Sequence, residues 1–280
     1  MTVINTNTAA TLTANALTKN ERAMNQTMER LSTGQRINSA ADDAAGLAIS
    51  SKMTSQINGL NMAVKNANDA ISMLQTYDGA LIEISNMSQR MRELAVQSAS
   101  DTNVTADRTN LNTEFEQLTA EIERIANNTQ WNGTNLLDGT LSAAQAFQVG
   151  ANANQTITIT LADANIAHGA QVQATSLFGG LDSATYGAGT IDADNGIDAR
   201  DILTKAKANL VIADLDNALS KINTFRATVG ATINRLEYAV DNLSNVSQNA
   251  SASRSRILDA DYASETTELA RTQIIQQAGT

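Results

Sequence analysis

His168 is the only histidine in the 280-residue sequence, so a catalytic triad or a histidine metal site would have to use it. It lies in the short segment Ile-Ala-His-Gly, and we interpret it as an exposed loop histidine. The sequence has no cysteine, which excludes disulfides, thiolate metal ligands and a cysteine nucleophile.

Two carboxylate pairs, Asp42 with Asp43 and Asp259 with Asp261, are the other candidates for acid–base chemistry. Both pairs stand where helices are expected to start, and acidic side chains are favoured at that end of a helix. Residues 192–196 (Asp-Ala-Asp-Asn-Gly) resemble a calcium loop, but the glycine comes one position early and no glutamate closes the loop. The sequence therefore predicts no catalytic, cofactor or metal site.

The elements that carry these residues are expected to be long helices. The sequence contains no proline, whereas ordinary usage of about 5% would give about a dozen in a chain of this length. Because proline interrupts helices, its absence favours unbroken ones. Leu17, Met24, Met28 and Leu31 form a narrow apolar stripe that predicts a first helix, and this helix should end at Gly34.

A much longer apolar stripe runs from Ile57 to Leu94 and predicts a helix over residues 46–100, about 80 Å long. Ser39 and Asp42 before it have the spacing of a capping box. Stripes over 111–125 and 215–243 predict two partner helices. A helix of this length needs neighbours along its whole side, so we predict a mainly α fold: a long, rod-like antiparallel bundle with coiled-coil packing.

The middle of the sequence has a different pattern. Residues 130–133 (Gln-Trp-Asn-Gly) are typical of a turn, and residues 155–161 alternate as a strand does. Residues 147–150 precede that strand, so a small β-hairpin is expected at one end of the bundle. Residues 163–200 are rich in glycine, alanine and aspartate and predict loops and short strands.

The two ends of the chain carry more apolar surface than they can cover. A last helix is expected after Asp261, with Leu269, Ile274 and Ile275 as its apolar positions. Isolated helices as short as those expected over 1–38 and 258–280 are marginal in water. We therefore predict that these segments become ordered by pairing with other subunits.

Charge and hydropathy exclude several classes of partner. The net charge of −10 argues against nucleic acid, which requires clustered lysine and arginine. No apolar run approaches the roughly 18 residues that span a membrane. The first residues lack the features of a secretory signal peptide, which leaves export by another route open.

Five segments form long, specific motifs. They are residues 31–49 (beginning Leu-Ser-Thr-Gly-Gln-Arg-Ile-Asn), 89–97 (Gln-Arg-Met-Arg-Glu-Leu-Ala-Val-Gln), 129–133 (Thr-Gln-Trp-Asn-Gly), 253–263 and 273–279. In this order they resemble the terminal halves of the bacterial flagellin family, over about residues 2–138 and 210–280.

The resemblance implies a structural subunit of the flagellar filament that self-assembles into a helical tube for motility and is not an enzyme. It implies an inner filament-core domain of residues 1–45 and 258–280. Residues 46–257 would form an outer rod domain, with the β-hairpin region at about 140–200. The hook–filament junction protein, which shares the terminal signatures, is the alternative. A chemoreceptor-like signalling rod would need a membrane anchor and methylatable Glu/Gln pairs at its hairpin tip, whereas the sequence shows no anchor and predicts a β tip.

The resemblance also implies partners and surfaces. Export by the flagellar type III route would bring the chain to the extracellular filament, with an export chaperone, the filament cap and hook-associated proteins as partners. The surface for the vertebrate flagellin-sensing Toll-like receptor maps onto Gln89, Arg90, Leu94 and Glu114. The assembly seams of the inner domain map onto Leu17, Met24, Met28, Leu31, Leu269, Ile274 and Ile275.

Members usually continue past residue 280 by roughly twenty residues, a helical length of about 30 Å. The lack of that tail is expected to weaken the inner domain and its assembly and to remove the segment read by the cytosolic flagellin sensor.

Overall fold

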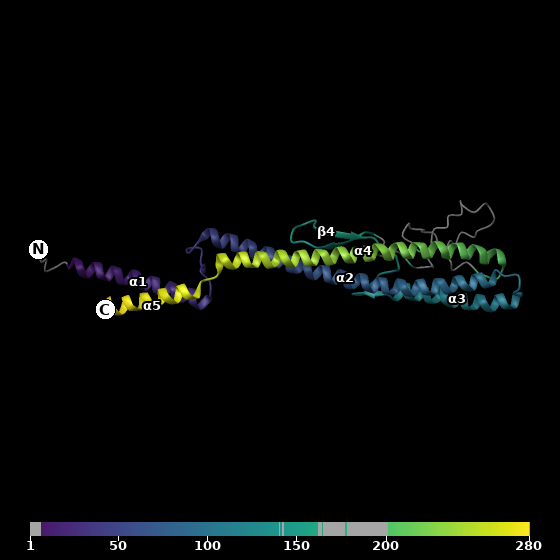
Figure 1. The fold of residues 1–280 in the computed structure, drawn as a ribbon, viewed down its shortest axis with the longest axis horizontal. Coiled ribbons are helices and arrows are strands. Elements are labelled where there is room, and N and C mark those ends of the chain that lie inside the picture. The colour runs from purple at the N-terminus through teal and green to yellow at the C-terminus, as the bar shows by residue number, and fades with distance from the viewer. Residues whose placement is uncertain are drawn as a thin grey trace. The chain divides into compact units, whose positions relative to one another are not determined.

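The structure is a computed structural model that describes residues 7–139, 141, 143–161, 164, 177 and 201–279. These residues form five helices and two antiparallel strand pairs, which confirms the predicted mainly α fold (Figure 1). The elements are α1 (Thr8–Thr33), α2 (Ala44–Ser98), α3 (Thr105–Asn128), β1 (Gln130–Trp131), β2 (Thr134–Asn135), β3 (Gln145–Gln148), β4 (Thr156–Ile159), α4 (Lys205–Leu258) and α5 (Tyr262–Gly279). His168 and residues 192–196 lie outside the described residues.

Helix α1 begins and ends with local hydrogen bonds. The side chain of Asn7 accepts a 3.1 Å bond from the backbone N–H of Ala10. At the other end Gly34 adopts a left-handed conformation with φ of 69°, and its N–H donates to the carbonyl of Arg30. A residue without a side chain adopts this conformation at little cost, so the predicted stop at Gly34 is confirmed.

The capping box predicted for the start of α2 is wrong in its capping residue and in its position. The hydroxyl of Ser39 donates to the carboxylate of Asp42 instead of accepting a backbone bond. The side chain that caps α2 is Asp43, which accepts a 2.9 Å bond from the N–H of Gly46. Asp42 instead closes the loop before the helix by accepting from the N–H of Ser39 at 2.9 Å.

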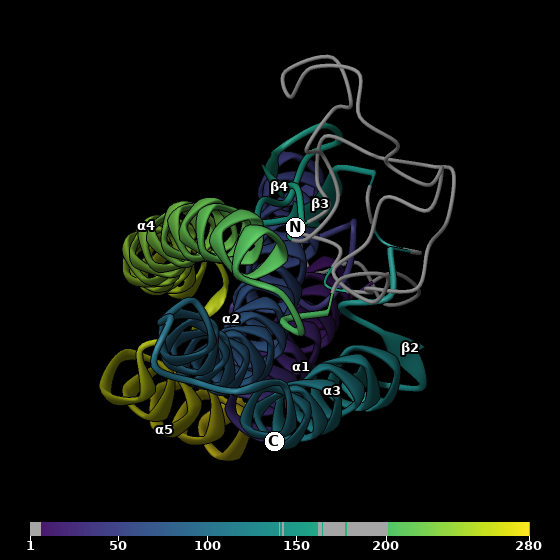
Figure 2. The same cartoon turned by 90° about the vertical axis from the view of Figure 1, so that its right-hand side faces the viewer.

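The chain divides into two compact units, each described here by itself. We call them the arm unit, Met1–Asn61 with Leu243–Thr280, and the central unit, Met62–Asn242. In the central unit α2 and α4 run antiparallel, because Arg226 pairs with Asp78 at 2.9 Å and Arg92 pairs with Asp216 at 2.6 Å. Helix α3 lies beside α2 in both views (Figure 1 and Figure 2), and its Glu114 pairs with Arg90 of α2 at 2.8 Å.

One apolar core holds the central unit together. Its fully buried side chains come from α2, α3, α4 and the segment after β2, and the largest include Leu74, Tyr77, Leu81, Ile84, Phe115, Ile122, Leu136 and Leu137. These α2 positions repeat at intervals of three or four residues, which is the stripe that the sequence predicted.

The predicted hairpin is present as β3 and β4. Phe147 pairs with Ile157 and Gln145 with Ile159 in an antiparallel register. Ile157 and Ile159 are buried against the core of the central unit, while Thr156 and Thr158 face outward. The predicted turn joins β1 to β2 through Asn132 and Gly133, both with positive φ.

Candidate interaction surfaces

Helices α1 and α5 pair antiparallel in the arm unit through polar contacts. The side-chain amide of Asn20 donates a 2.8 Å bond to the carbonyl of Thr272. One end of the pair is joined by an ion pair of 3.3 Å between Arg30 and Glu265. Nearby, the hydroxyl of Tyr262 donates to the carbonyl of Leu31 at 3.1 Å.

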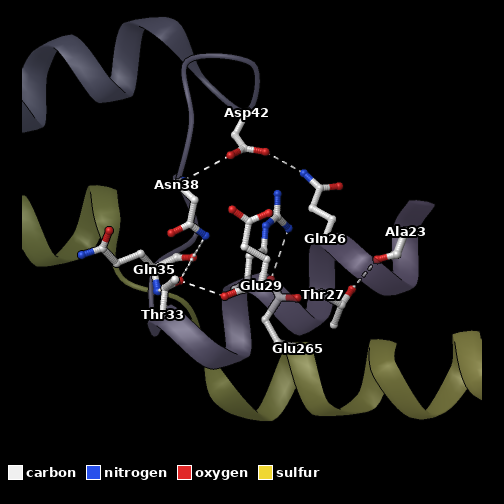
Figure 3. A network of polar contacts seen from close by, with 10 residues as sticks. Ala23, Gln26, Thr27, Glu29, Thr33, Gln35, Asn38, Asp42 and Glu265 are labelled. Atoms are coloured by element: carbon white, nitrogen blue, oxygen red, sulfur yellow. Dashed lines mark hydrogen bonds and ion pairs between the residues drawn. The ribbon is translucent and has the colours of Figure 1, made fainter. Parts of the chain in front are cut away.

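The α1–α5 pair has almost no apolar core of its own. Among the described residues of the two helices, the only buried side chains are Thr27 and Thr272. Thr27 satisfies its hydroxyl by donating to the carbonyl of Ala23 one turn earlier (Figure 3). Apolar burial supplies most of the stabilisation of a helix pair in water, so this pair is weakly held in a single chain.

The predicted seam residues separate into two groups. Leu17, Met24, Leu31 and Leu269 are partly covered. Met28, Ile274 and Ile275 are exposed, with exposed fractions of 52%, 66% and 45%. Burying one such side chain fully is worth about 1.5–3 kcal/mol. The exposed group is therefore a surface that a neighbouring molecule could cover with a large gain.

Two further members of this surface were missed by the sequence reasoning. Leu12 on α1 is 74% exposed and Tyr262 on α5 is 60% exposed. Leu12 precedes Leu17 by five residues, an interval that a search for three- and four-residue steps passes over. Tyr262 is the first residue of α5, and the apolar residue one turn before it, Leu258, belongs to α4.

A carboxylate-centred loop lies next to the α1–α5 pair in the same unit. Asp42 accepts bonds from the backbone N–H of Asn38 and from the side chain of Gln26 on α1, the latter at 2.8 Å (Figure 3). It also accepts a 2.9 Å bond from the backbone N–H of Ser39. The bond from Ser39, followed by those from Gln26 and Asn38, lowers the pKa of Asp42 below its ordinary value. The charged form of Asp42 therefore ties the loop before α2 to α1.

The predicted receptor surface centres on an ion-pair cluster in the central unit. The guanidinium of Arg90 on α2 pairs with Glu114 of α3 at 2.8 Å and with Glu93 at 3.0 Å. The hydrogen bond to Glu114 is the main reason why the pKa of Arg90 is raised. Gln89, Arg90 and Glu114 are all exposed, so this part of the predicted site is open to a partner.

Leu94 does not share that exposure. Its side chain is only 1% exposed and belongs to the core of the central unit. The apolar stripe of α2 contains Leu94, and the packing of α2 follows that stripe. The structure thus corrects the assignment of Leu94 to the exposed surface. Leu94 lies one turn after Arg90 on α2 and packs into the core of the central unit.

Among the helices that the structure describes, none combines the length and the hydropathy that a membrane crossing requires. In the same residues, no three histidine, cysteine, aspartate or glutamate side chains gather closely enough to hold a metal ion.

Comparisons with known proteins cover most of the chain. Residues 4–142 match the profile of the bacterial flagellin N-terminal helical region, and residues 212–280 match that of the C-terminal helical region. A flagellin of Halalkalibacterium halodurans is 44% identical over 251 residues, which cover 90% of this chain and 83% of that protein. The flagellin of Bacillus subtilis is 41% identical over an alignment that covers 98% of this chain and 93% of that protein.

The fold of this chain is also similar to that of a solved structure. It is a Vibrio parahaemolyticus protein provisionally described as flagellar hook-associated, with a TM-score of 0.60 over 78% of this chain and all of that one. At 13% identity it shows similarity of fold alone. The two profile matches and the two flagellin relatives show more, and from them we conclude that this chain belongs to the bacterial flagellin family.

Proposed function

We propose that the chain is the repeating structural subunit of a flagellar filament and that copies of it assemble through the arm unit. Membership of the flagellin family supports the filament role. The assembly surface is inferred from the exposure of Met28, Ile274 and Ile275 on α1 and α5. In the described part of this helix pair, the only buried side chains are two threonines. A neighbouring subunit would supply the missing apolar contact.

The domain assignment follows from this role. We assign residues 1–45 and 258–280 to the inner core of the filament and residues 46–257 to the outer rod. The pairing of α1 with α5, which lie at opposite ends of the sequence, supports an inner domain built from both termini. The hairpin β3–β4 would lie in the outer domain.

Filament formation tests the proposed function directly. The chain would be produced in a motile bacterium whose own flagellin gene has been deleted, and cells would be imaged by electron microscopy. We expect helical filaments that contain this chain. Filaments that form only when another flagellin is restored, with this chain confined to a short segment at the hook, would favour the junction-protein alternative.

That alternative has less support. The likeness to the Vibrio parahaemolyticus protein rests on 13% identity, whereas the two flagellin relatives are 41% and 44% identical over most of their lengths. An enzymatic activity is not part of the proposal, because nothing in the described surfaces resembles a catalytic arrangement.

Export and partners complete the proposal. The chain would leave the cell through the flagellar type III route and become part of the extracellular filament, with an export chaperone, the filament cap and hook-associated proteins as partners. The lack of cysteine suits transport of an unfolded chain, since no disulfide can form on the way.

We propose that the vertebrate flagellin-sensing receptor recognises the surface around Gln89, Arg90 and Glu114. Leu94 would position α2 through its packing in the core of the central unit. Replacing Arg90 with alanine should weaken receptor signalling by roughly tenfold or more, as expected for a central interface arginine. Arg124→Ala is the matched control, because Arg124 is another exposed arginine, which pairs with Glu121 on α3. Equal signalling by both variants would contradict the assignment.

A further inference from the structure

A pocket on the central unit has a lining that suits a positively charged organic group. It is an open pocket of about 270 Å³ between α2, β1 and β3, and its lining includes Asp69, Met73, Trp131 and Phe147. We propose that this pocket binds a methylated or primary alkylammonium group, which would sit against the two aromatic rings with its charge facing Asp69.

The two aromatic side chains are held in place by the fold. Trp131 is the last residue of β1, directly before the turn at Asn132 and Gly133. Phe147 belongs to β3, opposite the buried Ile157 of β4. Both rings pack against the core of the central unit and are only partly covered, so each keeps an open portion that a ligand can reach.

Aromatic rings attract cations because their faces carry negative charge density, and tryptophan does so most strongly. Asp69 adds a full negative charge to the same lining. No hydrogen bond or ion pair of this carboxylate is found in the described part of the chain, although Lys65 lies one turn earlier on α2. The charge of Asp69 is thus left for an incoming cation.

Other ligand classes fit the pocket less well. Its lining contains no basic side chain, which disfavours phosphate and carboxylate ligands. A purely apolar ligand would leave Asp69 facing a group that cannot compensate its charge. An alkylammonium group matches both parts of the lining, since its methyl or methylene groups contact the rings while its charge meets the carboxylate.

The experiment uses Trp131 as its own reporter, because it is the only tryptophan in the chain. The full chain would be titrated with choline and with 3,3-dimethylbutan-1-ol, which has the same shape without the charge. Ionic strength would be matched with sodium chloride. Indole fluorescence and the single indole N–H signal in NMR would be followed. We expect saturable shifts with choline at roughly 1–10 mM and at least fivefold weaker binding of the alcohol.

Variants test the lining. Asp69→Asn should weaken choline binding roughly fivefold, and Phe147→Leu should weaken it by a similar factor. Glu83→Gln is the matched control, because Glu83 is another exposed α2 carboxylate outside the pocket and should leave binding unchanged. Circular dichroism melts would show that each variant remains folded.

A second arm distinguishes the source of the ligand. N-acetyl-lysine methylamide and its Nε-trimethyl form would be titrated in the same way. Binding of choline alone indicates a free small molecule, and binding of either lysine compound indicates a lysine of another protein; both outcomes support the site. Equal affinity for the neutral alcohol, unchanged binding in Asp69→Asn, or no response to any cation would overturn the proposal.

Discussion

The side-chain amide of Asn20 donates a 2.8 Å hydrogen bond to the backbone carbonyl of Thr272, a residue 252 positions later in the chain. This bond joins the two terminal helices at a point where neither buries a large apolar side chain. Polar contacts of this kind fix which faces of α1 and α5 meet, while the exposed apolar residues Met28, Ile274 and Ile275 remain available to other molecules.

Removing that bond should loosen the α1–α5 pair. Asn20→Ala deletes the donor and leaves the carbonyl of Thr272 without this partner, which should lower the local stability of the pair by about 1 kcal/mol. Hydrogen exchange of the α5 amides in the monomer measures this directly. Asn25→Ala, at an exposed α1 position, is the control, and similar exchange in both variants would contradict the assigned role of Asn20.

The Arg30–Glu265 ion pair should matter more than an ordinary surface pair. The side chains of Arg30 and Glu265 are only 26% and 13% exposed, and Nε of Arg30 is buried without a partner. Glu265→Ala should therefore destabilise the pair by about 1–3 kcal/mol, because a half-buried guanidinium loses its counter-charge.

Thermal melting followed by circular dichroism measures that loss as an earlier melting of the terminal helices. Glu21→Ala removes an exposed carboxylate from α1 and should have little effect. If Arg30→Met in the Glu265→Ala background fails to recover part of the stability, the explanation by an unpaired charge is wrong.

The exposed seam residues should affect assembly and leave the monomer nearly unchanged. Met28→Ser and Ile274→Ser remove side chains that are worth about 1.5–3 kcal/mol each when a neighbour covers them, so each should raise the critical concentration for polymerisation tenfold or more. Light scattering after seeding measures this concentration. Val104→Ser alters a side chain that is 63% exposed in the central unit and serves as the control.

The loop before α2 should respond to acid through Asp42. Hydrogen bonds favour its charged form and lower its pKa below the ordinary value of 3.8. A group of this kind stabilises the folded loop fully above its unfolded pKa, and the stabilisation is lost as pH falls through the lower folded value. The loop should therefore stay closed at neutral pH and open only below about pH 4.

An NMR titration of the Ser39 amide measures this transition. The shift of that amide should follow the protonation of Asp42, with a midpoint below 3.8, and Asp42→Asn should remove the pH dependence. Asp241→Asn, at an exposed α4 position, should leave the Ser39 transition as it is. A midpoint at or above the ordinary value would contradict the hydrogen-bond arrangement.

The sequence predicted the helices and the hairpin well because their signals are local. The spacing of Leu74, Leu81 and Ile84 reports a helix face directly, and Gly34 marks a stop because its backbone must take a positive φ. The alternation before Leu161 predicted β4, since neighbouring residues in a strand face opposite sides.

Features that depend on distant residues were harder to predict. Ser39 and Asp43 are both chemically suited to cap α2, and only the path of the loop places Asp43 at the cap. Nothing in the sequence pairs Arg30 with Glu265, which are separated by 235 residues. Leu94 belongs to the apolar stripe of α2, which predicts its burial. It also lies in the motif of residues 89–97, and the resemblance of that motif to the family placed it on the receptor surface instead.

In the proposed filament, neighbouring subunits cover the apolar surface that α1 and α5 expose. Hydrogen exchange of their amides, compared between the monomer and the assembled filament, tests it most directly. We predict weak protection of α1 and α5 in the monomer and at least hundredfold slower exchange after assembly, which corresponds to about 2.7 kcal/mol. Equally strong protection in the monomer would show that the arm unit is stable without neighbours and would rule out assembly through this surface as proposed.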